Sequence, residues 1–262
     1  MDFRLAIFAL SFAAVSSLSF GQLKDPPPPA KAAGAEEKDW LEFYYQNPHP
    51  DDFVKEVKGF SEQGLMNNDQ VRPVLIAFLS QVLRANPKEI SNWYLQLQGL
   101  PIADMKTLHT AMLFSRTKEA DGIMRKKYGK KFEEMAVDLP KILEMALDKK
   151  ETMDMLWGFF YATGSESVIR RFVIAFRFDL APENPEGVKV PEGHRPLFKE
   201  LPADVMVMLL SNSERHPIII RMLKNFYEND KTMLPVEKEW VYEFLAEIDP
   251  KNYPPKPRPD GV

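Results

Sequence analysis

Apolar residues recur at helical spacing along most of this chain, and strict alternation of apolar and polar residues is nowhere sustained. The spacing of three or four residues that joins one helical turn to the next marks several separate segments. These segments are Trp40–Tyr44, Ile90–Leu97, Met153–Tyr161, Val168–Phe176 and Trp240–Ile248. Because a strand with one buried face requires a period of two residues, the pattern predicts an all-α protein.

Prolines divide this pattern into short pieces. Most of them stand just ahead of an apolar run. In the first turn of a helix a backbone N–H group has no intrahelical acceptor, so proline is tolerated there. They are Pro50, Pro87, Pro101, Pro140, Pro202, Pro217 and Pro235. The steps between them leave room for helices of about ten to twelve residues and tight turns, so we expect about nine or ten short antiparallel helices.

Two arrangements of these helices are open. Short helix hairpins in succession are typical of a degenerate helical-repeat protein with a solenoid-like layout. The steps from Pro50 to Pro87 and from Pro101 to Pro140 approach known repeat lengths, but no residue signature recurs at either step. An irregular helical bundle is therefore the alternative.

Residues 1–21 have the parts of a secretory signal peptide. Arg4 supplies a positive charge, and the apolar stretch from Leu5 to Val15 is too short to cross a bilayer core of about 30 Å. The small residues Ser19 and Gly21 fit a cleavage site after residue 21. We expect cleavage, rather than an uncleaved anchor or a buried core helix, and hence a secreted protein of the periplasm or the extracellular space.

Cysteine content and charge narrow the functional classes. The chain has no cysteine, so disulfides, thiolate metal sites, cysteine nucleophiles and a lipoprotein anchor are excluded. Its formal net charge of -4 argues against a nucleic-acid partner, which normally requires a basic surface. No segment after the signal peptide has the apolar length of a transmembrane helix.

Composition shifts predict the organisation of the remaining chain. A linker rich in Pro and Ala spans residues 22–37, and the helical domain follows over residues 38–248. Within this domain, residues 179–200 hold several prolines and little periodicity, which predicts an irregular loop. Residues 249–262 are too rich in proline for a helix, and we expect a disordered or polyproline II tail.

A search for catalytic and metal-binding patterns assigns no catalytic residue, no cofactor and no metal site. The histidines have no helical partner ligand one turn away, and they stand far apart at positions 49, 109, 194 and 216. Two methionine pairs, Met153 with Met155 and Met206 with Met208, diverge on a helix and suit a core better than Cu(I). Gly164 and Ser165 are typical of a helix–helix turn rather than a nucleophile elbow.

The strongest charge feature lies in the middle of the chain. Five cations surround one tyrosine and one glycine, and they are Arg125, Lys126, Lys127, Lys130 and Lys131. Such a cluster is a candidate contact for an anionic surface: a lipid, a polysaccharide or an acidic protein face. The alternative is a solvated helix end at which the cations complement the helix dipole and Gly129 stops the helix.

Several aromatic and turn motifs resemble a family of bacterial proteins. The motifs are Trp40-Leu41-x-Phe43-Tyr44-Tyr45-x-Asn47-Pro48, Ala77-Phe78-Leu79 with Asn86-Pro87 and Trp93, and Asp154-x-x-Trp157-Gly158-x-Phe160-x-Ala162-Thr163-Gly164. In these motifs the chain is similar to uncharacterised exported proteins that carry an all-helical domain of unknown function. The resemblance spans about residues 40–248 and implies no catalytic residue.

These observations favour a non-catalytic, exported helical scaffold that binds a protein or peptide in the extracytoplasmic space. The alternative is an enzyme or small-ligand-binding protein whose site is assembled from scattered residues such as His109, Arg116 and Asp154. A deep pocket that joins several titratable groups would favour this alternative. A third hypothesis is surface association through residues 125–131, which would depend strongly on salt.

Overall fold

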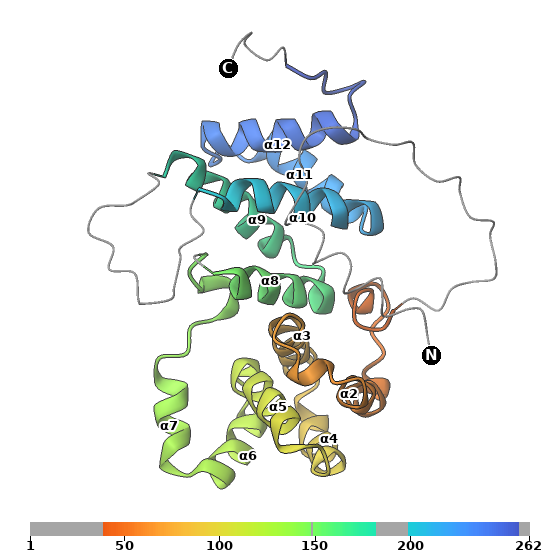
Figure 1. Ribbon diagram of the computed structural model, residues 1–262, viewed down its shortest axis with the longest axis vertical. Coiled ribbons are helices and arrows are strands. Elements are labelled where there is room, and N and C mark those ends of the chain that lie inside the picture. The colour runs from red at the N-terminus through yellow and green to blue at the C-terminus, as the bar shows by residue number, and fades with distance from the viewer. Residues whose placement is uncertain (1–38, 148, 182–198, 257–262) are drawn as a thin grey trace, which may run out of the picture. The chain divides into compact units, whose positions relative to one another are not determined.

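The computed structural model describes residues 39–147, 149–181 and 199–256, and all regular structure in these ranges is helical (Figure 1). The α-helices are α2 (Phe53–Glu62), α3 (Arg72–Ala85), α4 (Ile90–Leu97), α5 (Ile102–Ser115), α6 (Lys118–Tyr128), α7 (Lys130–Val137), α8 (Lys150–Thr163), α9 (Glu166–Ala175), α10 (Leu201–Arg215), α11 (Ile218–Asn229) and α12 (Pro235–Ile248). The 3-10 helices are η2 (Tyr44–Gln46), η3 (Pro50–Asp52), η4 (Leu65–Asn67), η5 (Pro87–Glu89), η6 (Ile142–Glu144) and η7 (Phe176–Leu180). The all-α prediction is confirmed.

Parts of the predicted organisation lie outside the described residues. The signal peptide (1–21), the linker (22–37) and most of the predicted loop (179–200) belong to this category. Between η7 and α10, only residues near the two ends of that loop are described. Within the described residues, no helix combines the length and apolar content that a membrane crossing requires.

Prolines mark helix starts much as their spacing suggests. Pro50, Pro87 and Pro235 are the first residues of η3, η5 and α12. Pro101 and Pro217 stand one residue earlier, at the N-caps of α5 and α11. Two further prolines occupy the second position, Pro73 in α3 and Pro202 in α10. At each of these positions a backbone N–H group would have no acceptor within the helix, so its absence in proline costs no hydrogen bond.

Helix α8 is central to the packing of the first half of the domain. It packs against α3, α9, η2 and η6, and α3 packs in turn against α5 (Figure 1). At Gly158 of α8 the two helix backbones approach so closely that an added Cβ atom would overlap the carbonyl oxygen of Val74 in α3. Glycine therefore sets the separation between α3 and α8.

The second half is built from α9 to α12 and η7. These elements contact one another as neighbours in sequence and also across the group, since α9 touches α10, α11 and α12. In the first half, α3 likewise contacts helices that do not follow it directly in sequence, α5 and α8.

The choice between a degenerate helical repeat and an irregular helical bundle stays a prediction.

The first part of the proline-rich segment, residues 249–256, packs onto α11 and α12. Tyr253 lies 5.9 Å from Tyr227 and 6.1 Å from Tyr242 between ring centroids. Tyr242 donates its hydroxyl hydrogen bond to the carbonyl of Pro254 at 2.8 Å, and Lys224 pairs with Asp249 at 2.8 Å. Each of these contacts involves a side chain of Lys224, Tyr242 or Tyr253, and none needs a backbone N–H group that proline lacks.

Candidate functional site

His109 lies in a cage of two tyrosines from neighbouring helices. Its Nε2 atom is 3.2 Å from the hydroxyl of Tyr94 on α4, and its Nδ1 atom is 2.8 Å from the hydroxyl of Tyr128 on α6. The side chain is buried, and burial together with the nearby charge of Lys127 lowers the pKa of His109 to about 4. The ring is therefore neutral near pH 7, with one nitrogen donating and the other accepting.

His216 lies in a second and more polar cluster, at the C-terminal end of α10. Its Nδ1 atom is 3.1 Å from the hydroxyl of Tyr45, and its Nε2 atom is 3.2 Å from Oε1 of Glu42. The second oxygen of Glu42 pairs with the guanidinium of Arg215. The Nε2 atom is buried and lies near Glu42 without meeting hydrogen-bond geometry.

The order Glu42, His216, Tyr45 has the form of an acid–base–hydroxyl relay. Burial raises the pKa of Tyr45, which keeps the phenol protonated and makes it a poor nucleophile. His216 is fully buried, and its ring is surrounded by aromatic side chains at centroid distances of 5.0 to 5.7 Å. These are Phe43, Tyr45, Phe160 and Tyr161. The arrangement holds the segment around residues 42–45 against α8 and α10.

Asp154 is a buried acid without a complete set of partners. Its side chain is 4% exposed, and its Oδ1 atom makes no hydrogen bond. Burial raises the pKa of Asp154 to about 7, although the attraction of Lys150 opposes this shift. One helical turn further along α8, Nε1 of Trp157 is also buried without a partner. The sequence offered Asp154 only as one of several scattered candidates, and its place beside a second buried group without a partner, Trp157, was not foreseen.

The three residues named for an assembled site, His109, Arg116 and Asp154, have no hydrogen-bond or ion-pair partner in common among the described residues. Arg116 caps α5 in the left-handed conformation, with φ 52, and its guanidinium donates to the carbonyl of Leu139. His109 is enclosed by tyrosines and Asp154 lies on α8. Among the described residues, no hydrogen bond or ion pair joins any two of the three.

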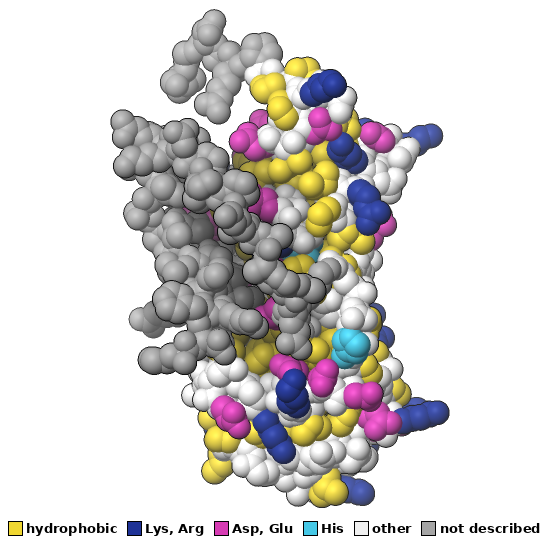
Figure 2. All heavy atoms as spheres, turned by 90° about the vertical axis from the view of Figure 1, so that its right-hand side faces the viewer, with side chains coloured by type: hydrophobic (Ala, Val, Ile, Leu, Met, Phe, Trp, Pro, Cys, Tyr) yellow, Lys and Arg dark blue, Asp and Glu magenta, His cyan; other side chains and the backbone are white. Residues whose placement is uncertain are grey.

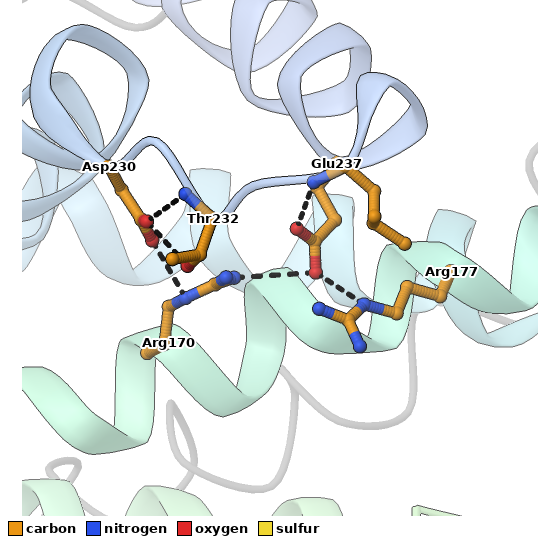
Figure 3. A network of polar contacts seen from close by, with 6 residues as sticks. Arg170, Arg177, Asp230, Thr232 and Glu237 are labelled. Atoms are coloured by element: carbon orange, nitrogen blue, oxygen red, sulfur yellow. Dashed lines mark hydrogen bonds and ion pairs between the residues drawn. The ribbon is translucent and has the colours of Figure 1, made fainter.

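A further polar network ties α9 and η7 to the start of α12 (Figure 3). Glu237 is fully buried, and its Oε1 atom pairs with Arg177 at 2.7 Å and Arg170 at 3.3 Å. Its other oxygen accepts the backbone N–H of Leu234 at 2.8 Å. Arg170 also pairs with Asp230 at 3.1 Å. Since both carboxylates are matched by cations and hydrogen bonds, the network is a structural clamp.

The five predicted surface cations are all exposed, and they lie on both sides of a sharp turn. Arg125, Lys126 and Lys127 end α6, whereas Lys130 and Lys131 begin α7. Gly129 forms the turn with φ 56 and ψ -129, a conformation that favours glycine. Arg125 pairs with Glu133 at 2.7 Å. The helix-dipole explanation therefore suits the cations of α6 but not the two lysines at the start of α7.

The described residues form no metal site, and a surface hollow among them does not include the buried histidines. No group of three His, Asp or Glu side chains in the described ranges is placed to hold a metal ion. Met153 and Met155 are both buried in the core. A surface hollow of about 700 Å³ lies over α2 and α4, and neither His109 nor His216 lines it. The side chains that line it are Asp51, Val54, Lys55, Glu56, Lys58, Gly59, Glu62 and Gln96.

Comparisons of the chain with protein families, with curated proteins and with solved structures gave no match. The resemblance to exported helical proteins stays a prediction from its motifs. Two motif residues have packing roles: Trp157 stacks on Phe172 with a centroid distance of 4.6 Å. An added Cβ atom at Gly164 would lie 2.5 Å from the ring of Tyr45.

Proposed function

We propose that this chain is an exported helical scaffold that binds another protein or a peptide through its surface. The observation that carries the proposal is the set of contacts made by the two buried histidines. His109 engages both ring nitrogens with tyrosines from α4 and α6, and His216 is enclosed between Tyr45 and Glu42. Side chains that could act in acid–base chemistry are thus used to join separate segments of the fold.

The exposed charges support a surface role. On the face drawn in Figure 2, acidic and basic side chains are mixed with hydrophobic ones over the described residues. The α6–α7 turn differs, because its lysines outnumber the nearby acids. A local excess of one charge on a surface selects partners of the opposite charge.

Photo-crosslinking in the producing cell tests the proposal. A photoreactive amino acid at the position of Lys130 probes the α6–α7 turn, and one at the exposed Lys58 of α2 is the control. We expect a discrete protein adduct from position 130, whose purified partner binds the mature chain in calorimetry. If neither position gives a protein adduct, the scaffold role is contradicted.

Asp154 favours a second candidate, a small-ligand-binding or catalytic role between helices. Its buried unpartnered oxygen and its pKa of about 7 are features found at functional sites as well as at strained structural ones. Native mass spectrometry of the purified chain and of Asp154→Asn separates the two functions. A small molecule retained by the wild type and lost from the variant would support the second candidate.

Export is the remaining component of the proposal, and it depends on the signal sequence of residues 1–21. Mass spectrometry of protein recovered from outside the cytoplasm would give the mature N-terminus. We expect it at Gln22. An intact Met1 on the exported protein, or recovery from the cytoplasm alone, would contradict cleavage.

A further inference from the structure

The four lysines at the α6–α7 turn, Lys126, Lys127, Lys130 and Lys131, are called the lysine corner below. All four are exposed, and no ion pair within the described residues involves any of them. Arg125, the fifth cation of the segment, is already paired with Glu133. The lysine corner therefore has charge available for a partner.

Buried contacts fix the backbone that presents the lysine corner. Tyr128 lies between the two lysine pairs, and its hydroxyl is bonded to the buried His109 at 2.8 Å. Phe132 is buried on the other side of the turn, and the guanidinium of Arg125 lies 4.8 Å from the centre of its ring. A preorganised set of charges loses less conformational entropy on binding than a flexible one.

The lysine corner is electrostatically unfavourable without a counter-charge. Lys130 and Lys131 stand in the first turn of α7, where the helix dipole repels cations. The lysines of α6 add like charges across the turn. Since the whole chain has a net charge of -4, this positive field is local, and it decays within about 10 Å at ordinary ionic strength. The geometry thus suits a short anionic segment at contact distance.

Acidic and apolar side chains around the corner distinguish between anionic partners. Glu133 and Glu134 are exposed on α7, so a uniformly anionic lipid surface would bring its headgroups against them as well. Met135 follows Lys131 by one helical turn and is 41% exposed, and Val137 is 74% exposed. A peptide can place carboxylates against the lysines and an apolar side chain against Met135. A flat layer of lipid headgroups offers only the anionic groups.

We propose that the lysine corner and Met135 of α7 dock an acidic peptide segment of a partner protein. The segment carries carboxylates for the lysines and an apolar residue for Met135. This inference rests on the proposed scaffold function and adds the surface and the chemistry of the partner. The main contacts of α7 are with α6, and Lys130, Lys131 and Met135 of α7 are exposed within the described domain.

The experiment measures binding of a fluorescein-labelled peptide rich in Glu and containing one Leu to the mature chain by anisotropy. The test variant carries Lys126→Gln, Lys127→Gln, Lys130→Gln and Lys131→Gln. The matched control carries the same change at four other exposed lysines, Lys58, Lys106, Lys231 and Lys251. We expect affinity to fall about tenfold or more in the test variant and less than about twofold in the control.

Two further variants test the apolar and positioning contacts. Met135→Gln keeps every charge and is expected to weaken the Leu-containing peptide but not a peptide with Gln in place of Leu. Tyr128→Phe keeps the lysines and the ring and removes the bond to His109. We expect a loss of about threefold in affinity from this loosened turn. Matching helical circular dichroism spectra establish that each variant is folded.

Equal weakening by the test and control variants would overturn the inference, since the attraction would then be non-specific. A parallel arm uses vesicles of phosphatidylcholine and phosphatidylglycerol. Vesicle binding that depends on the lysine corner, with no peptide binding, would also overturn it in favour of a lipid surface. If the partner found by crosslinking still binds the test variant normally, only this inference fails, whereas absence of any protein partner contradicts the scaffold function itself.

Discussion

Helices α8 and α7 differ sharply in how much of their surface is buried. Every residue of α8 from Thr152 to Gly158 is buried, whereas Phe132 is the only buried residue of α7. α8 contacts α3, α9, η2 and η6, but the main contacts of α7 are with α6 (Figure 1). The comparison teaches that a helical apolar stripe in the sequence does not tell how many faces of that helix are covered.

The charged residues of α8 and α7 differ in the same way as the burial of the two helices. In α8 the one acid of the buried run, Asp154, has its pKa raised to about 7 by burial. In α7 the lysines are solvated, and their field extends outward. Burial thus turns a polar residue into a cost to stability, whereas exposure leaves its charge free for recognition.

The largest expected effect is the removal of the central ring of α8. Trp157→Ala should destabilise the protein by about 3–5 kcal/mol, because the surrounding helices leave a cavity that cannot collapse. Phe132→Ala in α7 should cost less, since α7 can shift against α6. Chemical denaturation measures the free energy of unfolding of both variants. Equal losses would contradict the idea that α8 is packed more tightly than α7.

Gly158→Ala tests the close approach of α8 to α3. The added methyl group would overlap the carbonyl of Val74, so we expect a loss of about 3 kcal/mol as the helices separate. Gly122→Ala in α6 is the matched control, because its added methyl group meets open space. That variant should be stabilised by up to about 1 kcal/mol through helix propensity. A neutral Gly158→Ala would show that α8 is free to move.

Asp154→Asn tests the cost of the buried acid through pH. Because the folded state binds the proton more tightly than the unfolded chain, wild-type stability should fall as pH rises from about 4 to 7 and level off above. Relative to wild type, the variant should gain about 2 kcal/mol between pH 5 and pH 8. The exposed Asp138→Asn is the control and should show no such gain. A pH-independent difference between Asp154→Asn and wild type would contradict the raised pKa.

The smallest effect is expected at the edge of the α6–α7 region. Tyr128→Phe removes one hydrogen bond to His109, and we expect a loss of about 1 kcal/mol. Thermal unfolding followed by circular dichroism measures it. A loss as large as that of Trp157→Ala would place the α6–α7 turn within the same cooperative core as α8.

The sequence predicted much of the fold but little of the candidate site. The apolar spacing of Met153, Leu156 and Trp157 indicated a buried helix face, and the structure has all three in the core. The prolines indicated helix starts within a residue or two. The lysines were visible as a cluster, and Gly129 ends α6 as expected, but the start of a second helix directly after Gly129 was not predicted.

The amino-acid sequence by itself determined the local features of this protein: helical periodicity, proline-marked starts and the density of charge near residue 128. These follow from interactions over three or four residues, which the order of side chains sets directly. Only the tertiary structure decided that Asp154 is buried, that Gly158 touches α3, and that His109 and His216 are enclosed by tyrosines. The physical reason is that burial of a second helix face depends on which distant segment packs against it, and local spacing carries no record of that choice.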